Sequence, residues 1–486
     1  MRDKIVTAAA HPLYSAMLEI WEKNRDCYDG EDVIKDKGSR YLPATSGMVL
    51  DGFGSNNVES AGFKAYTAYK MRAYFAEIVR DAVESAVGAM HINEPEIQLP
   101  KNMEYLLDNA TYDGESLAML LRTINEKQLV TGRVGLLGDF KTSYDNKEEI
   151  VLIVYPEVSC FNWDDISDDK DSSVLRFVAL DESSYEMAED YSWNYVNKTR
   201  GLALTDKDGK LISFEDIKAN NNVNSYSYGS GVIRNEYDLK GIQYEDVNVK
   251  GTTINRIPFT FINSKDLCAK PDTPPLNGLC NLALAIYRGE AGYRQNLFMQ
   301  GQDTLVIVGA NSSDDDEPVR TGAGSRINVG AQGDAKFIGT ESNGLSEQRE
   351  SLQNDYKRAE ARTAKLVNQS GQESGEALKI RVAAQTATLP QIAITGAAGL
   401  QKVLRDMAVL FGENPDEVVV KPNLEFADIL GDGKTLNDII DAKIKGAPIS
   451  NESIHSWLVD NKFTTKTFLD EMTIIDGEAP DGGLTD

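Results

Sequence analysis

The sequence predicts an α+β fold with several parts, and three observations predict it. One long helical segment spans residues 276–301, and a second helical stretch spans residues 344–412. Between about residue 150 and residue 262, short runs of alternating polarity are typical of an antiparallel sheet. A small β unit at residues 302–340 lies between the two helical stretches.

The composition limits the classes of function. The chain has 486 residues, which favours about two to four domains. Its 50 Lys and Arg against 76 Asp and Glu give a formal net charge of −26. Because a protein that grips nucleic acid through its phosphates needs a basic face, tight static DNA binding is not expected.

The cysteines and the N-terminus indicate the compartment. Four scattered cysteines without a Cys-x-x-Cys pair fit a reduced, cytosolic environment with no disulfide framework. The N-terminus is charged and has no signal-type apolar core. No run of about 18 apolar residues occurs, so no membrane span is predicted.

The first 131 residues predict helices. Residues 11–29 form an amphipathic pattern, and residues 62–91 form a second helical pattern that ends before Pro95. Residues 47–60 are rich in Gly, Ser and Asn and predict an exposed insertion. Residues 101–131 predict two more helices, separated at Tyr112-Asp-Gly114.

The β region follows directly. A glycine-rich segment, Gly132–Gly138, leads into it. The strands are predicted at 150–155, 174–180, 191–196, 231–237 and 257–262.

A Pro-bounded helix and a compact β unit come next. Residues 276–301 predict a helix of about 26 residues. Three short strands then follow, at 304–308, 326–329 and 336–338. An acidic run, Asp314, Asp315, Asp316 and Glu317, occupies the longest loop between them.

The stretch from 344 to 412 predicts two helices and a polar hinge. In the first helix, apolar or small residues recur on one face: Leu345, Leu352, Tyr356, Ala359, Thr363 and Leu366. The hinge, Asn368–Gly375, has two glycines and no apolar residue. The second helix is predicted from about Glu376 to Phe411, with a kink at Pro390 because proline removes a backbone donor.

The remaining elements are shorter. Residues 416–426 predict a strand, and residues 434–473 predict short helices with a capping-box-like Ser450-Asn-Glu-Ser453. The acidic, Gly-rich C-terminal residues predict a frayed end.

The motifs that could carry chemistry favour structural roles. Gly431–Thr435 resembles the end of a phosphate-binding loop, but Asp428 stands where the full pattern needs a glycine. Thr321–Ser325 lacks the third glycine of a dinucleotide fingerprint and favours a turn. His11, His91 and His455 have no neighbours at metal-ligand spacing, so caps or packing are expected.

The acidic turn at 164–171 lacks the glycine and the terminal glutamate of a calcium loop, so a solvated turn is expected. No Gly-x-Ser-x-Gly elbow occurs. We therefore expect no cofactor, no metal and no catalytic site, and hence a protein that is not an enzyme.

In their order along the chain, these parts resemble the portal proteins of tailed bacteriophages. The local motifs that carry the resemblance are His11–Tyr14, Trp21, Gly30, Tyr41–Pro43, Tyr66–Ala73, Gly88, Pro95–Pro100, Gly132–Asp139, Tyr155–Glu157, Asn162-Trp163, Ile257–Asn263, Ala377–Arg381 and Thr386–Leu389. Their order and spacing cover nearly the whole chain. The resemblance implies a portal fold with wing, stem, clip and crown, assembled as a ring around a central channel.

The resemblance also implies boundaries for these parts. They are a wing (1–270, β-rich from about 150), a first stem helix (271–301), a clip (302–340), a second stem helix (341–367), a tunnel loop (368–375), a kinked helix and strand returning to the wing (376–430), and a crown with the C-terminal tail (431–486).

By the same resemblance, the chain forms a homo-oligomeric ring of about twelve subunits at one capsid vertex of a virion, assembled in the host bacterial cytoplasm. Double-stranded DNA passes through it during packaging and ejection. The implied partners are the terminase large subunit, a head-tail connector or adaptor, and the major capsid protein or scaffold, with no membrane.

The resemblance implies two groups of site residues. Lys365, Asn368, Gln369, Gln372 and Ser374 belong to the tunnel loop that faces the DNA channel. Asp314, Asp315, Asp316 and Glu317 belong to the clip that docks partners. Two alternatives stay open: another ring-forming head-tail connector, or a nucleotide-dependent DNA enzyme keyed to Gly431–Thr435.

Overall fold

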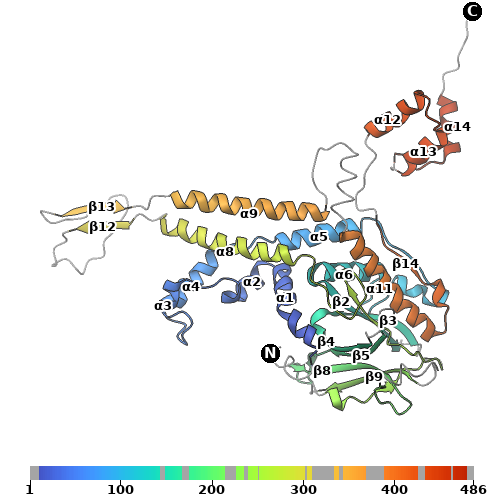
Figure 1. Ribbon diagram of the computed structural model, residues 1–486, viewed down its shortest axis with the longest axis horizontal. Helices are drawn as coiled ribbons and strands as arrows, with labels where there is room; N and C mark the ends of the chain where they lie inside the picture. Colours follow the sequence, from blue (N-terminus) through green and yellow to red (C-terminus); the bar gives the residue numbers. More distant parts are fainter. Residues whose placement is uncertain are drawn as a thin grey trace, which may run out of the picture.

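The computed structural model describes residues 10–142, 148–166, 174–213, 226–234, 239–249, 251–300, 304–308, 333–338, 343–367, 388–424, 433–460 and 463–478. Within these ranges the molecule is elongated (Figure 1). A body of sheets and helices lies at one end, and two long helices project from it and end near a two-stranded sheet. The mixture of helix and sheet confirms the predicted α+β class.

The helices are distributed over the whole chain. In the N-terminal part they are α1 (Pro12–Asp29), α2 (Glu31–Asp36), α3 (Ser46–Leu50), α4 (Ala61–Arg72), α5 (Ile78–Met90) and α6 (Leu117–Thr131). In the C-terminal part they are α8 (Asn277–Gln300), α9 (Asn343–Val367), α11 (Thr388–Phe411), α12 (Gly433–Ile444), α13 (Asn451–Asp460) and α14 (Phe468–Glu478).

Two sheets form the body. A three-stranded sheet has the order β11 (Phe259–Asn263), β2 (Arg133–Thr142) and β3 (Glu148–Pro156). A five-stranded sheet has the order β10 (Glu245–Asp246), β9 (Ser227–Arg234), β8 (Lys198–Thr205), β5 (Val174–Asp181) and β4 (Cys160–Ile166).

Three two-stranded sheets complete the described strands. They are β1 (Glu96–Gln98) with β14 (Val419–Lys421), β6 (Ser184–Met187) with β7 (Trp193–Val196), and β12 (Thr304–Val308) with β13 (Asp334–Ile338). All pairings of the described strands are antiparallel, as predicted for the β region.

Helix α11 packs against the three-stranded sheet so closely that glycines are needed on both sides. A Cβ added at Gly138 of β2 would lie 2.4 Å from the Met407 side chain, and one added at Gly399 of α11 would lie 2.5 Å from Ile262. Leu400, Val403 and other residues of α11 are fully buried here. This contact joins the C-terminal part of the chain to the core of the body.

A second core lies where the helical N-terminal part meets α8. Phe75, Tyr287 and Ile392 are buried in it. The rings of Phe75 and Tyr287 meet edge to face, with centroids 5.8 Å apart. Residues of both long helices, α8 and α9, belong to this core, which attaches the two helices to the body.

The predicted single helix at 62–91 is wrong, because the chain leaves the helix between α4 and α5. Ala73 takes an extended conformation, with φ −63° and ψ 145°. Phe75 is 1% exposed, and its N–H donates to Glu31 Oε1 at 3.3 Å. Burial of Phe75 against Tyr287 therefore outweighs the helical propensity of this segment.

Other boundaries also differ from the prediction. Residues 101–107 form a 3-10 helix instead of an α-helix. The strand expected at 416–426 is shorter than predicted, because residues 415–417 form a 3-10 turn and only Val419–Lys421 form the strand β14. The strands that were not predicted are β1, β2, β4, β6, β8 and β10. The strand expected at 326–329 lies outside the described residues.

Pro390 lies in the first turn of α11 as the helix is described. A proline there removes no intrahelical hydrogen bond, because the first N–H groups of a helix have no partner within it. The expected start of this helix near Glu376 lies outside the described residues.

Candidate functional site

The two projecting helices, α8 and α9, form an antiparallel pair that we call the stem. Arg362 Nη1 donates to the Gly278 carbonyl oxygen at 2.6 Å near the body. Tyr356 Oη donates to Glu290 Oε1 at 3.2 Å further out, and Asn296 Nδ2 donates to Gln348 Oε1 at 3.0 Å toward the far end. The order of these three contacts runs in opposite directions along the two helices.

The apolar contact of α9 is narrow. Among its described side chains, only Leu352 and Ala359 are buried, at 8% and 1% exposure. They are seven residues apart and therefore lie on one face of the helix, as predicted. Leu352 approaches Gly289 of α8 so closely that an added Cβ would lie 2.9 Å from its Cδ2. The remaining faces of α9 are polar and largely exposed.

The stem differs from the rest of the chain in charge. Helix α8 contains two arginines and one glutamate, and α9 contains five basic and four acidic residues. The pair therefore has seven basic and five acidic residues, whereas the chain has a net charge of −26. The stem is locally close to neutral within a strongly acidic protein.

The base of the stem is held by specific polar contacts. Lys23 Nζ of α1 donates to Asn277 Oδ1 at 2.7 Å and to Asn281 Oδ1 at 2.6 Å. Arg288 Nε donates to the Tyr41 carbonyl oxygen at 2.9 Å. These contacts fix the direction in which the stem leaves the body.

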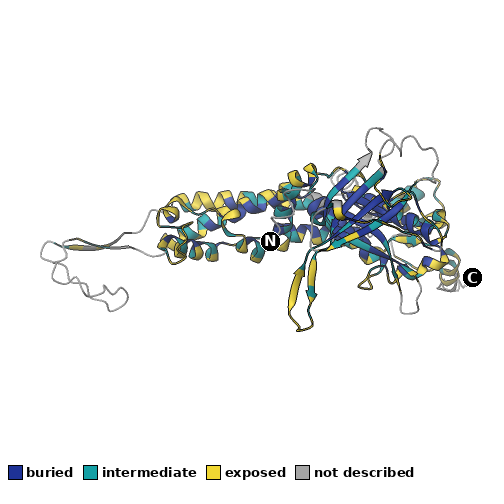
Figure 2. Ribbon diagram, turned by 90° about the horizontal axis from the view of Figure 1, so that it is seen from below, coloured by how far each residue is buried: buried dark blue, intermediate teal, exposed yellow. Residues whose placement is uncertain are grey.

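A hairpin made of β6 and β7 projects from the five-stranded sheet, and we call residues 181–196 the arm. Figure 2 shows an exposed hairpin standing away from the body. Tyr185 pairs with Tyr195 and Met187 pairs with Trp193 across the two strands, so these four side chains share one face. They are exposed by 66%, 44%, 56% and 63% in the order just given.

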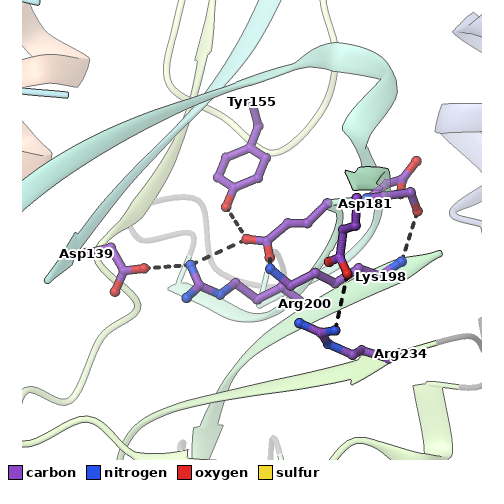
Figure 3. Close-up of polar contacts among 9 residues, drawn as sticks. Asp139, Tyr155, Asp181, Lys198, Arg200 and Arg234 are labelled. Carbon is purple, nitrogen blue, oxygen red and sulfur yellow. Dashed lines mark hydrogen bonds and ion pairs between the residues drawn. The ribbon is translucent and has the colours of Figure 1, made fainter. Parts of the chain in front are cut away.

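The root of the arm is an ion-pair network (Figure 3). Glu182 accepts from Tyr155 Oη at 2.7 Å, and its other carboxylate oxygen lies 2.9 Å from Lys198 Nζ. Arg200 Nη1 donates to Asp139 Oδ2 at 2.6 Å and lies 3.5 Å from Glu182 Oε1. The side chains of Glu182, Asp139 and Arg200 are 15%, 19% and 19% exposed, and that of Lys198 is 32% exposed.

The network shifts the pKa values of its members in consistent directions. Burial alone raises the pKa of Glu182, but the charge of Arg200 and the hydrogen bonds from Lys198 and Tyr155 bring it below its usual value. Burial alone lowers the pKa of Arg200, but Asp139 and Glu182 raise it above its usual value. The charged forms are therefore the stable ones, and the root of the arm is held by charge.

Most of the site residues predicted from the sequence lie outside the described ranges. Asn368, Gln369, Gln372 and Ser374 of the expected tunnel loop do so, and so do Asp314, Asp315, Asp316 and Glu317 of the expected clip. Lys365 lies in the last turn of α9. The strands β12 and β13 flank the segment that contains the clip acids.

The histidines have the structural roles expected of them. His11 caps α1, since its Nδ1 accepts from the Leu13 N–H at 3.1 Å, and its ring stacks on Trp163 at 4.0 Å. His91 ends α5, and His455 packs edge to face on Phe468 at 5.4 Å. Within the described ranges, no cluster of His, Cys, Asp or Glu is arranged to hold a metal ion.

Other features of the described residues bear on the remaining expectations. Asp164, at the start of the acidic turn, pairs with Arg176. The four cysteines, all within the described ranges, form no disulfide. Every described helix is too short or too polar to cross a bilayer.

Two cavities are lined by charged residues. One of about 140 Å³ is lined by Arg256, Lys402 and Asp406 together with apolar residues of β11. Arg256 and Asp406 form an ion pair there, so these charges satisfy one another. The other, about 420 Å³, lies between α5 and α9 and carries Asp81 and Glu360, which do not suit a phosphate ligand.

The arm as a unit was not predicted from the sequence. A strand was expected at 191–196, but its partner β6 was not. The sequence does contain a signal for a hairpin: apolar and polar residues alternate at Tyr185 and Met187 before the turn, and again at Trp193 and Tyr195 after it.

Comparisons with known proteins give one family match. A family model described as a domain of unknown function (DUF4055) matches residues 275–410. The matched segment begins just before α8 and ends one residue short of the end of α11, so it spans the stem. Among curated proteins, no relative matches this chain.

Solved structures give further matches. The neck of a native GTA particle with C12 symmetry is 13% identical, with a TM-score of 0.39, covering 80% of this chain and 91% of that one. The neck of an empty GTA particle with C6 symmetry is 13% identical, with a TM-score of 0.37, covering 79% and 90%. The virion of a native gene transfer agent particle is 13% identical, with a TM-score of 0.39, covering 81% and 92%.

The matched structures belong to the neck and the virion of gene transfer agent particles. At these TM-scores the likeness by itself assigns no function to this chain.

Proposed function

We propose that this chain is a portal-type protein, a non-enzymatic subunit of a ring that surrounds a DNA channel at one capsid vertex. The observation that carries the proposal is the stem. It is a pair of long helices that leaves the body, and one of them buries only a narrow line of its surface.

Helix α9 needs more contacts than a single copy provides. Its 25 residues correspond to a rod of about 37 Å. A helix that is polar on most faces is stabilised by neighbouring helices or by charge pairs on its surface, since its own apolar stripe is too small. In a ring of about twelve copies, the stems of adjacent copies supply those neighbours.

The charge of the stem suits a channel through which DNA slides. An acidic surface repels the phosphates, and a strongly basic surface holds them. The stem has seven basic and five acidic residues, so its contacts with a phosphate backbone are weak and exchangeable. The acidic remainder of the chain acts at short range only, because salt screens charges beyond about 10 Å at 0.1 M.

The expected partners follow from the same proposal. Double-stranded DNA passes through the ring during packaging and ejection. The terminase large subunit, which hydrolyses ATP, and later a connector or adaptor dock at the clip, and the capsid protein or scaffold contacts the wing. Assembly takes place in the host cytoplasm, and the mature ring remains in the virion.

The first experiment determines the oligomeric state of the purified chain. Electron micrographs and native mass measurement at micromolar concentration are expected to show closed rings of roughly twelvefold symmetry. A monodisperse monomer under these conditions contradicts the proposal. Binding of a nucleotide analogue, measured on the same sample, would support the enzyme alternative instead.

A second experiment addresses the tunnel loop. Removal of Gln369 to Gln372 is expected to spare ring assembly and to impair completion of packaging or retention of packaged DNA. The control is an equally long deletion in the C-terminal tail, from Asp481 to Leu484. If the shortened hinge packages and retains full-length DNA like the parent, the tunnel-loop role is wrong.

A third experiment addresses the clip. Replacing Asp314, Asp315, Asp316 and Glu317 with Ser is expected to leave rings intact and to slow association with the motor or connector, because charges at a rim act mainly on the association rate. The effect is expected to shrink at high salt. Unchanged association at low salt contradicts a docking role for these acids.

A further inference from the structure

The arm has an apolar face that its own subunit leaves uncovered. Tyr185, Met187, Trp193 and Tyr195 lie on this face, while Ser184, Glu186, Asn194 and Val196 lie on the other. Tyr185 and Tyr195 contact each other edge to face, with ring centroids 5.1 Å apart. A two-stranded hairpin is only marginally stable in water unless such a face is packed against something.

The arm is also preorganised. The Glu182 N–H donates to the Lys198 carbonyl oxygen at 2.8 Å, and the Lys198 N–H donates to Ser183 Oγ at 3.0 Å. The side chain of Glu182 also forms ion pairs with Lys198 and Arg200, which hold the same end of the hairpin. A projection whose root is fixed in this way loses little conformational entropy when its tip binds.

The arm has acidic character. Residues 181–196 contain five acidic residues, Asp181, Glu182, Glu186, Glu189 and Asp190, and no Lys or Arg. Glu182 and Glu186 are paired within their own subunit, with Lys198 and Arg200 and with Arg234 respectively. Glu189 and Asp190 are exposed at the turn. A surface that receives the arm should therefore combine apolar side chains with positive charge.

The same chain has a surface of this character where α4 meets α8, which we call the α4–α8 patch. Met71, Tyr74 and Phe298 are exposed there by 74%, 44% and 46%. The guanidinium of Arg72 lies over the Phe298 ring at 4.2 Å, and that of Arg294 lies over the Tyr74 ring at 5.3 Å. These contacts place a cation beside each of the two aromatic rings, and the same arginines also donate to Gln295 and Glu290.

We propose that the arm of one copy docks on the α4–α8 patch of a second copy of this chain. This inference rests on the ring of the proposed function. The arm and the patch are different surfaces, and a contact between two different surfaces of identical subunits repeats head to tail, which is the type of contact that a closed ring requires. The aromatic face of the arm also suits the two arginines of the patch through cation–π contacts.

The size of the contact fits one part of a ring interface. Three half-exposed aromatic side chains and a methionine bury on the order of 400 Å² of apolar surface when covered. A standard interface buries about 800 Å² per partner. The arm therefore stabilises a ring together with other contacts and is too small to hold two copies by itself.

The main test changes the apolar face of the arm. The variant Tyr185→Ser/Trp193→Ser/Tyr195→Ser is compared with the control Ser184→Ala/Asn194→Ser, which alters the opposite face of the same strands. The concentration at which rings are half dissociated is measured by mass photometry. We expect it to rise at least about tenfold in the aromatic variant and to stay at the parental value in the control.

The outcomes separate this inference from the proposed function. If the parent forms no rings, the proposed function is wrong, and the proposed docking contact is wrong as well. If the parent forms rings and the aromatic variant has the same half-dissociation concentration, only the docking contact is wrong.

A cross-linking experiment tests the receiving surface and does not depend on how the aromatic variant folds. Ser192→Cys at the tip of the arm and Met71→Cys in the patch are made separately, each with Cys268→Ser, because Cys268 is the exposed native thiol. Mixed and oxidised, the two proteins are expected to give a disulfide-linked dimer, which neither gives alone. Rings without this cross-link, or links between two Ser192→Cys copies, overturn the assignment of the patch.

Discussion

Helices α11 and α9 have almost the same length, and the molecule holds them in opposite ways. Fifteen of the 24 residues of α11 are buried, against the sheet and α6. Among the described side chains of α9, which has 25 residues, two are buried. The body therefore supports α11, whereas most of the described surface of α9 stays uncovered. Helix length alone does not distinguish a core helix from an exposed one, but the width of its apolar face does.

The largest expected effect separates the two helices directly. Leu400→Ala in α11 should lower the free energy of unfolding of the body by about 3 kcal/mol, because it leaves a cavity in a fully packed core. Leu352→Ala in α9 should lower it clearly less. Urea unfolding followed by fluorescence of the buried Trp21 and Trp163 measures both. Equal losses would contradict the distinction between body and stem.

The root of the arm should respond next. Glu182→Gln is expected to destabilise the body by about 2 kcal/mol, because Lys198 and Arg200 lose a charged partner in a shielded site. Glu189→Gln at the exposed turn is the matched control and should change stability by less than about 0.5 kcal/mol. The same unfolding experiment measures both variants. Similar losses of unfolding free energy would show that the ion pairs of Glu182 do not stabilise the body.

The network also predicts a pH dependence. The folded pKa of Glu182 is below its usual value of 4.5, so its contribution to stability is present above about pH 4.5 and is lost as pH falls through the folded pKa. As pH falls below about 4.5, the parent should therefore lose more stability than Glu182→Gln. Parallel curves would show that the pKa of Glu182 is the same in the folded and the unfolded protein.

His91, at the end of α5, tests the junction between body and stem. Burial, with a smaller effect of Arg122, lowers its pKa from 6.5 to about 4. The unfolded chain takes up the proton first, so stability should fall as pH decreases from 6.5 to about 4 and level off below. His91→Gln should remove this slope in thermal unfolding. An unchanged slope would assign it to other groups.

The smallest expected effect concerns the surface of the stem. Arg349, Lys357 and Arg358 are exposed, so replacing all three with Gln should change the unfolding free energy of the body by less than about 0.5 kcal/mol. The same replacement should reduce retention of DNA in assembled rings, most clearly at low salt. A loss of stability of more than about 1 kcal/mol would mean that these residues support the body after all.

The sequence predicted those elements whose periodicity is undisturbed. The helices at 277–300 and 343–367 and the strands β3, β5 and β11 agree with the expected positions, because each has a single dominant pattern. The interruption at Ala73 was not predicted, since it depends on Phe75 packing against Tyr287, more than 200 positions away. No local pattern contains such a contact.

The candidate site could be predicted only in part. The polar surface of α9 follows from its composition. The arm could not be predicted as a projecting unit, because Tyr185 and Trp193 in a strand usually indicate burial. The root from which they project is a network that joins Glu182 to residues of three strands, namely Asp139 of β2, Tyr155 of β3, and Lys198 and Arg200 of β8.

The close contact of Leu352 with Gly289 lies near the middle of α8 and in the first half of α9, and it is a pivot about which the two helices rotate against each other. From this pivot, α9 extends roughly 14 Å to Asn343 and roughly 22 Å to Val367. A rotation of about 5° moves these two ends by about 1.2 Å and 2.0 Å, and the two ends move in opposite senses. A side chain at Gly289 would force the helices apart at the pivot. A small displacement at the far end of the stem is thereby geometrically coupled to an opposite displacement at the end that leads into residues 368–375.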